Sequence, residues 1–224
     1  EHPNLWFMLA LARQINLPET LQELMNGGAW PVRTWDPGLA RDIMLARQAR
    51  GEKLYTSAYM LNAHGRGPKD PADKAFFTCF LVLQQAWDDR RKIAAAFAGP
   101  SMQAAWASLL PHHGWGGFTA YEVVCDARYT RYGARWRDIN RWAHAGPGAV
   151  RGLNRLHGRP LKTPLKQIQA LEEMQALMIS MNANWEHKPV LELREIEHSL
   201  CEYDKYQRVL LGEGAPRQKF VPNL

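Results

Sequence analysis

Dipeptides of Asp or Thr followed by Pro mark the starts of several long helical segments in this chain of 224 residues. Asp36-Pro37, Asp70-Pro71 and Thr163-Pro164 each place a capping side chain before a proline, which suits the first position of a helix. Gly51 and Gly99 follow the first two segments, and glycine is the usual residue just past a helix end. The sequence therefore predicts helices from Pro37, from Pro71 without a break to about residue 98, and from Pro164.

Apolar residues recur at helical spacing in the C-terminal part of the chain. After Pro164 the predicted apolar stripe is Leu165, Ile168, Leu171, Met174 and Met178. A last helix is expected from about residue 190 to 211, with the stripe Leu193, Ile196, Leu200, Tyr203 and Leu210. Residues 121–130 form the richest β-branched and aromatic run, but no hairpin turn accompanies them, so we interpret them as helical. The fold class that follows is all-α.

No Gly- or Pro-rich break is long enough to serve as an interdomain linker, so we expect residues 1–224 to form one domain, which can divide into two lobes around a cleft. No stretch of 18 apolar residues occurs, and the N-terminal apolar run lacks the basic region of a signal peptide. Cys79, Cys125 and Cys201 lack zinc-ligand spacing and are expected to be reduced core thiols. We predict no metal site and no cofactor.

The positive charge of the chain is concentrated in one segment. The net charge is +6, from 28 Lys and Arg against 22 Asp and Glu. Residues 128–166 contain ten Lys or Arg and one acid, Asp138, so this basic block carries +9 and the rest of the chain −3. A local excess of this kind points to a polyanionic partner.

The basic block contains a candidate anion site. Gly146-Pro147-Gly148 is expected to form a tight turn between two helices, where backbone N–H groups and the helix dipole favour negative charge. Arg151 and Arg155 share a face of the following helix, with Asn154 beside them. Two guanidiniums there would suit a DNA phosphate or a pyrophosphate. The alternative is an ordinary turn followed by solvated arginines.

The last predicted helix carries two densely ionisable faces. One presents Glu195, His198, Glu202 and Lys205, and the other Glu197, Cys201, Asp204 and Arg208. His198 and Glu202 lie four residues apart, as do Glu197 and Cys201, and a carboxylate beside an imidazole can act as a general base. The alternative is a surface helix crossed by ion pairs.

Two further segments combine aromatic and polar side chains. On one, Tyr121 and Cys125 share a helical face, with Asp126 and Arg128 nearby. On the other, the helical face is Tyr55, Tyr59 and Asn62, which could stack on and hydrogen-bond a base. Both could equally be core tyrosines with their partners. No P-loop, dinucleotide-binding glycine motif, HExxH or GxSxG is present, so hydrolysis of nucleoside triphosphates, dinucleotide redox chemistry and serine hydrolase chemistry lose support.

These segments resemble a known family. WAHAGPGAVRGLNRLHG and LREIEHSLCEYDKYQRVLLGEGAPRQKF are similar to the two signature blocks of the α-glutamyl/putrescinyl thymine pyrophosphorylase family. GWGGFTAYEVVCDARYT and KLYTSAYMLNAHG are similar to two weaker blocks. The resemblance spans roughly residues 50–220, whereas residues 1–50 are expected to form helices that match nothing.

The resemblance implies a fold and a reaction. The family is related to helix-hairpin-helix DNA glycosylases, which implies a glycosylase-like helical domain. Its bacteriophage members act in thymine hypermodification: a kinase pyrophosphorylates 5-hydroxymethyluracil in DNA, and the family member replaces the pyrophosphate with an amine. The chain is then expected to be an amino acid or polyamine:DNA transferase that flips its target base out of the duplex. The implied partners are double-stranded DNA carrying 5-pyrophosphomethyluracil and the amine co-substrate, without a membrane, in the cytoplasm of an infected bacterium.

The implied roles fall on three groups of residues. Candidate catalytic residues are Glu197, His198, Glu202, Asp204 and Asp126. Candidate contacts to pyrophosphate and DNA are Gly146, Gly148, Arg151, Asn154, Arg155, Arg128 and Lys205. The candidate pocket for base and amine consists of Tyr55, Tyr59, Asn62, Tyr121, Tyr206 and Arg208, together with tryptophans. The catalytic Asp that glycosylases keep after the hairpin helix has no counterpart here, which argues against base excision. A glycosylase acting on a modified pyrimidine and a non-catalytic DNA-binding module remain the alternatives.

Overall fold

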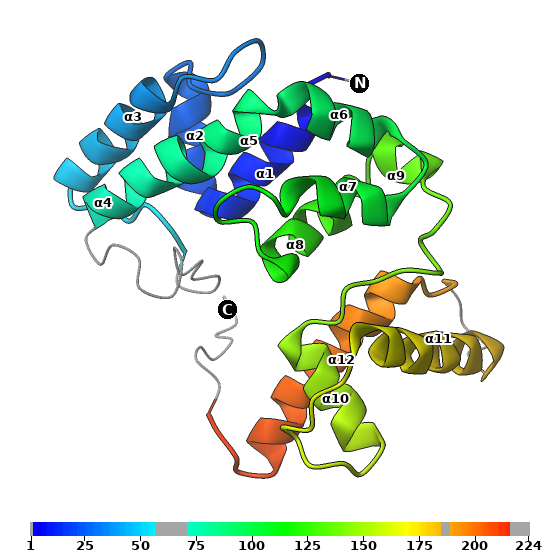
Figure 1. The fold of residues 1–224 in the computed structure, drawn as a ribbon. Coiled ribbons are helices and arrows are strands. Elements are labelled where there is room, and N and C mark those ends of the chain that lie inside the picture. Colours follow the sequence, from blue (N-terminus) through cyan, green and yellow to red (C-terminus); the bar gives the residue numbers. More distant parts are fainter. Residues whose placement is uncertain (1, 57–70, 185–188, 216–224) are drawn as a thin grey trace. The chain divides into compact units, whose positions relative to one another are not determined.

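The computed structural model describes residues 2–56, 71–184 and 189–215. Every regular element in these ranges is a helix, which confirms the predicted all-α class (Figure 1). Residues 121–127, the best strand candidate by composition, lie in a helix. No helix in the described ranges is long and apolar enough to cross a membrane. Contacts divide the chain into two compact units, residues 1–137 and residues 138–224.

Unit 1 is built from short helices around α1. In chain order its elements are α1 (Leu5–Ile15), α2 (Pro18–Asn26), α3 (Pro37–Ala49), α4 (Pro71–Phe76), the π-helix η1 (Phe77–Leu83), α5 (Gln84–Asp88), α6 (Arg90–Ala98), α7 (Met102–Leu109), α8 (Gly117–Ala127) and α9 (Arg131–Arg135). Asp36 caps α3 as predicted, because its Oδ1 accepts a hydrogen bond of 3.0 Å from the Leu39 N–H. The uninterrupted helix predicted after Pro71 is wrong. Its middle widens into η1, and at Asp89 the backbone leaves helical geometry before α6 begins.

Aromatic residues form the core of unit 1. Trp6 and Phe7 of α1 are fully buried. The Phe7 ring lies 5.3 Å from that of Trp35 and 4.9 Å from that of Trp87, while Trp6 lies 6.0 Å from Phe97. The other buried tryptophans of the described residues are Trp115, Trp136 and Trp142. Their bulk fills the protein interior, so these tryptophans are not the exposed stacking surfaces considered from the sequence.

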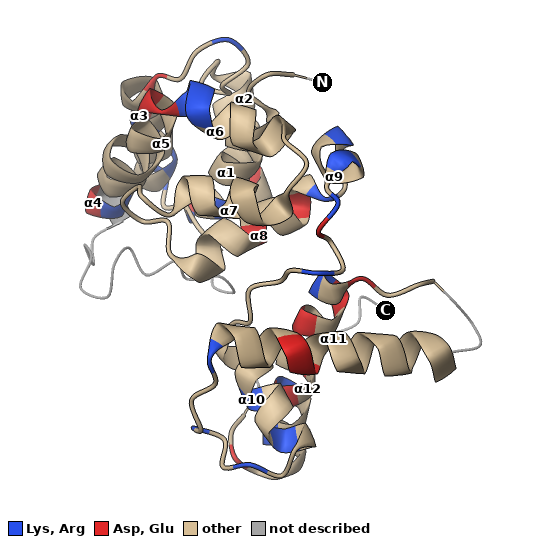
Figure 2. Cartoon of the chain, turned by 45° about the vertical axis from the view of Figure 1, so that its right-hand side comes forward, with Lys and Arg blue, Asp and Glu red and all other residues tan. Residues whose placement is uncertain are grey.

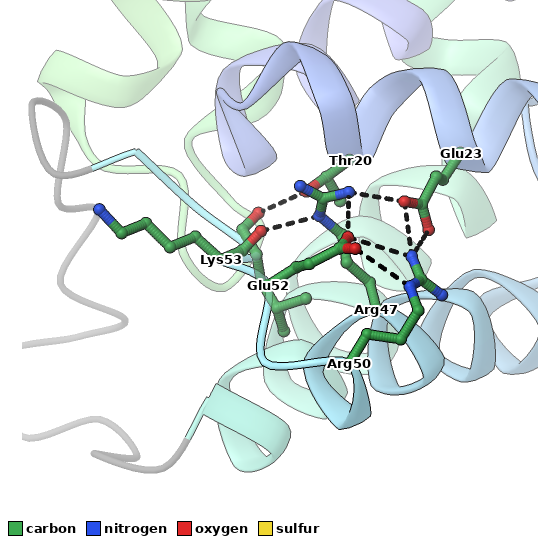
Figure 3. Close-up of polar contacts among 7 residues, drawn as sticks. Thr20, Glu23, Arg47, Arg50, Glu52 and Lys53 are labelled. Carbon is green, nitrogen blue, oxygen red and sulfur yellow. Dashed lines mark hydrogen bonds and ion pairs between the residues drawn. The ribbon is translucent and has the colours of Figure 1, made fainter.

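An ion-pair cluster holds the segment after α3 (Figure 3). Glu23 of α2 lies 2.6 Å from Arg47 and 2.7 Å from Arg50, both near the end of α3. Glu52 contacts the same two guanidiniums at 2.7 and 3.1 Å. Arg47 Nε also donates to the Lys53 carbonyl at 2.9 Å. The chain leaving α3 is thereby tied back to α2 by alternating charges.

In residues 138–184 and 189–215, the described part of unit 2, there are three helices, α10 (Pro147–Leu156), α11 (Gln167–Asn184) and α12 (Leu193–Leu210). Both α10 and α11 pack against α12. The predicted start of α11 at Pro164 is three residues early. Two members of the predicted stripes are also wrong, because Ile168 is 60% and Leu210 62% exposed. Met174 and Met178 of α11 and Leu193, Ile196 and Leu200 of α12 are buried as predicted, and Ala170 is a further buried residue of α11.

Candidate functional site

The candidate site lies where α10 packs on α12, and two glycines allow the close approach. A Cβ on Gly148 would lie 2.4 Å from Cys201 Sγ, and one on Gly152 would lie 2.4 Å from the Leu200 carbonyl oxygen. Both distances are well inside contact range, so any larger residue would push the helices apart. Burial also raises the pKa of the Cys201 thiol, which therefore stays protonated at neutral pH. Cys201 is a packing residue here.

The N-terminus of α10 is already occupied by a carboxylate of the chain itself. Glu197, 5% exposed, accepts a hydrogen bond of 2.9 Å from the Gly146 N–H. Pro147 occupies the first helical position. A carboxylate here is stabilised by the unpaired N–H groups and the dipole of the helix. The sequence predicts a DNA phosphate or a pyrophosphate at this turn, and in the structure the anion next to the Gly146 N–H is the Glu197 carboxylate.

The turn differs from the predicted helix–helix hairpin in what precedes it. The preceding helix, α9, ends at Arg135, and residues 142–146 lie outside any helix. The segment is held instead by Gln167 of α11, which donates to the Ala145 carbonyl at 2.9 Å and accepts from the Ala145 N–H at 3.1 Å. The Gly146 backbone is thus fixed by side chains of both α11 and α12.

An imidazole lies directly behind this carboxylate. His198 Nε2 is 3.7 Å from the second oxygen of Glu197, which is ion-pair distance. The Nε2 atom is buried, whereas the His198 side chain as a whole is 40% exposed. Glu202, the partner of His198 expected from the spacing, lies 2.5 Å from Lys205, and the carboxylate found next to the ring is that of Glu197. Such a pair can accept and release a proton.

The arginines of α10 face the acids of α12, in direct contact. Asp204 is fully buried and accepts hydrogen bonds from Arg151 Nε at 2.6 Å and Arg155 Nε at 2.9 Å. Glu213 also pairs with Arg155, whose side chain is only 8% exposed. Burial by itself raises the pKa of Asp204, but the hydrogen bonds from Arg155 and Arg151 outweigh it and the pKa falls below the usual aspartate value. Two positive charges assigned to an external anion are thus balanced by internal acids.

Asn154 and Arg159 fix the loop that follows α10. Asn154 is fully buried and donates to the carbonyls of Leu161 and Thr163 at 3.2 and 2.9 Å. The expectation that Asn154 contacts DNA is therefore wrong, because solvent does not reach it. Arg159 forms two hydrogen bonds of 2.7 and 2.6 Å with Glu173 of α11.

The remaining candidates of unit 2 lie on the outer part of α12. Glu202 and Lys205 pair with each other at 2.5 Å, with side chains 69% and 55% exposed. Tyr206 is 64% exposed and Arg208 partly exposed. The contacts of these four residues do not show whether they line a pocket or lie on an ordinary protein surface.

Six candidates belong to unit 1, and the structure describes four of them. Asp126 of α8 receives two hydrogen bonds from Arg13 of α1, at 2.5 and 2.7 Å, and Arg128 caps the end of the same helix. Tyr121 is 1% exposed and belongs to the core. The Tyr55 hydroxyl lies 3.3 Å from Thr78 Oγ1. Tyr59 and Asn62 lie outside the described residues.

Several functional contacts had no local signal in the sequence. Arg13 and Asp126 are 113 residues apart, and Gln167 reaches Ala145 across 22 residues. Glu173 and Glu213 were not among the residues singled out from the sequence, yet they hold Arg159 and Arg155. Pairings of this kind depend on which helices meet. Among the described residues, no three His, Cys, Asp or Glu side chains gather closely enough to hold a metal ion.

Comparison with known protein families shows to which family this chain belongs. The family model described as "5-hmdU DNA kinase, helical domain" matches residues 1–215. The chain belongs to this family. No curated protein and no solved structure matches the chain. Because the match begins at residue 1, the N-terminal 50 residues belong to the family region too, contrary to the expectation that they match nothing.

The family assignment supports the coarser part of the sequence prediction. The helical domain of 5-hmdU DNA kinase belongs to thymine hypermodification, in which 5-hydroxymethyldeoxyuridine in DNA is modified further. The family is therefore one of DNA modification, which is compatible with a DNA-modifying role for this chain and implies a DNA substrate. The match does not identify the pyrophosphorylase family that the signature blocks resemble.

Proposed function

We propose that this domain replaces the pyrophosphate of 5-pyrophosphomethyluracil in DNA with an amine. The observation that carries the proposal is the Glu197–His198 pair at the N-terminus of α10. In the reaction the amine nitrogen forms a bond to the methylene carbon, and the C–O bond to pyrophosphate breaks. Pyrophosphate leaves with the electron pair, and the ammonium nitrogen loses its protons to a base. The co-substrate is an amino acid or a polyamine, and the reaction takes place in the cytoplasm of an infected bacterium.

The geometry favours His198 as the base and Glu197 as its positioning residue. Glu197 is buried and accepts a hydrogen bond from the Gly146 N–H, and its second oxygen lies 3.7 Å from His198 Nε2. A buried carboxylate behind an imidazole also stabilises the imidazolium that forms. Arg151, 36% exposed, is the α10 arginine better able to reach a leaving pyrophosphate, since Arg155 is 8% exposed and shared between two acids.

The test uses duplex DNA containing 5-pyrophosphomethyluracil, incubated with glycine, serine, glutamate or putrescine in turn. The DNA is then digested to nucleosides for mass spectrometry, and released pyrophosphate is measured. A new amine-bearing nucleoside with equal pyrophosphate supports the transferase. An abasic site would instead support a glycosylase, and unchanged DNA with salt-sensitive binding would support a non-catalytic DNA-binding module.

Variants of α12 separate the two roles. Glu197→Gln keeps an oxygen that can accept the Gly146 N–H, so the fold should persist while transfer falls by on the order of 100-fold, the usual contribution of general-base catalysis. His198→Asn should reduce transfer similarly. Ser199→Ala, on the same helix but exposed, is the matched control and should retain activity. Full activity of both site variants would remove the pair from the mechanism.

A second function is favoured by the family description itself. The family is named as the helical part of a DNA kinase, and this chain has no P-loop. The domain would then bind DNA and present the 5-hydroxymethyl base to a phosphoryl-transfer domain. Binding to DNA that contains 5-hydroxymethyluracil distinguishes this function from amine transfer. Preferential binding over thymine DNA, with no amine transfer in the assay above, would favour the second function over the first.

A further inference from the structure

The acids of unit 2 neutralise the arginines first assigned to DNA, so we searched the described residues for basic side chains that the fold leaves outward. The segment from the end of α8 through α9 contains such a group. Arg131, Arg135 and Arg137 are exposed there, and Figure 2 shows blue ribbon, the colour of Lys and Arg, on and beside α9. No acid occurs in residues 127–137. We define Arg131, Arg135 and Arg137 as the α9 arginine face.

Buried residues between the arginines hold this segment rigidly. Tyr132 is 7% exposed, and its ring lies 5.7 Å from that of Phe97. Trp136 is 4% exposed and donates its indole N–H to the Phe97 carbonyl at 3.3 Å. Gly133 lies so close to α8 that a Cβ there would be 2.2 Å from the Arg128 carbonyl oxygen. The alternation of buried and exposed residues therefore turns the arginines outward from a fixed backbone.

Two further contacts define the edges of the face. The Arg137 N–H donates to the Pro100 carbonyl at 2.9 Å, which fixes the end of the segment. Asp126, the last acid before the segment, is held by two hydrogen bonds from Arg13. Tyr129 is 77% exposed beside the arginines and offers a ring that can stack on a base. Arginines on a rigid backbone with an exposed aromatic residue form a surface that suits nucleic acid.

We propose that the α9 arginine face binds the phosphate backbone of duplex DNA. The proposal rests on the proposed function, because it names the surface by which the domain holds its DNA substrate. It differs from the sequence prediction by moving the main phosphate contact from Arg151 and Arg155 to unit 1. In this account the arginines of α10 mainly hold α10 to α12, and the α9 arginine face supplies the salt-dependent part of binding.

The test compares two triple variants that lose the same charge from the same unit. Arg131→Gln/Arg135→Gln/Arg137→Gln removes the face, and Arg33→Gln/Arg91→Gln/Lys92→Gln removes three other exposed cations. Binding to a fluorescent thymine duplex is measured by anisotropy from about 50 to 300 mM salt. Three lost phosphate contacts should lower the slope of log K against log salt by about 2.7 and weaken binding on the order of 100-fold at about 0.1 M salt. The control should change binding less than about threefold.

Equal losses in both triple variants would overturn the proposal, because net charge would then explain binding. No loss in the face variant, or no duplex binding by the unmodified chain, would overturn it as well. Far-UV circular dichroism checks that both variants remain folded. The nucleoside assay is read separately at saturating DNA, where the face variant should still react. If the face variant loses binding but the unmodified chain shows no amine transfer, the proposed transferase function is wrong and the role of the α9 arginine face is still supported.

Discussion

Asp204 is expected to be the most costly single acid to neutralise in unit 2. Its carboxylate is fully buried and accepts one hydrogen bond each from Arg151 and Arg155. Asp204→Asn would keep the size of the side chain but leave two guanidiniums without their shared counter-charge. Removing one partner of a buried ion pair costs about 3–5 kcal/mol. Because the Arg151 side chain is 36% exposed, its share is screened, and we expect about 3 kcal/mol.

The assay is urea unfolding followed by far-UV circular dichroism, combined with hydrogen exchange resolved to peptides of α10 and α12. The exchange data assign the loss to unit 2, which the total helical signal cannot do. A loss of about 3 kcal/mol corresponds to a Tm lowered by more than roughly 10 °C in a unit of this size. Glu202→Gln on the same helix is the matched control, since its 69% exposed pair with Lys205 should contribute less than about 1 kcal/mol.

The stabilisation that Asp204 contributes depends on pH in a defined direction. The pKa of Asp204 is lower in the folded chain than its ordinary value, so its stabilisation is complete above the ordinary aspartate pKa of about 3.9. It is lost as the pH falls through the lower folded pKa. The stability difference between the unmodified chain and Asp204→Asn should therefore stay constant from about pH 7 to 5 and shrink below about pH 4. Equal stability of Asp204→Asn and Glu202→Gln at pH 7 would refute the reasoning.

Two further predictions test the packing of the units. Gly152→Ala should destabilise unit 2 by about 1–3 kcal/mol despite the better helix propensity of alanine, because its Cβ would meet the Leu200 carbonyl oxygen. Hydrogen exchange of α10 measures this, and unchanged protection would show that the glycine is not needed for close packing. Arg47→Gln should speed proteolysis of the segment after α3, since Arg47 joins Glu23, Glu52 and the Lys53 carbonyl. Cleavage at the rate of the unmodified chain would contradict the role given to that cluster.

Helix starts and the class of fold could be predicted because they depend on neighbouring residues. The Asp36 cap, Pro147 at the first position of α10 and the helical character of residues 121–127 all follow from local rules. The affinity of the α10 N-terminus for an anion is also a local property. Which anion it meets is not, because Glu197 lies 51 residues further along the chain.

Side-chain partners could not be predicted where they depend on how helices pack. Arg151 and Arg155 looked like a free pair of cations on one helix face, and only the packing of α12 brings Asp204 between them. The burial of individual apolar side chains could not be predicted for the same reason. Ile168 fits the apolar spacing of α11, yet the face that α12 covers is the one with Ala170 and Met174. Periodicity predicts that a face exists, whereas tertiary contacts decide which residues it buries.

The central claim is that this domain acts on 5-hydroxymethyluracil-derived bases in DNA through the α10–α12 site. The most direct measurement is mass spectrometry of nucleosides after incubation of the unmodified chain, and of Glu197→Gln, with duplex DNA carrying 5-pyrophosphomethyluracil and an amine. The account predicts a new amine-bearing nucleoside from the unmodified chain and on the order of 100-fold less from Glu197→Gln. Unchanged nucleosides with both proteins, or equal product from both, would contradict it.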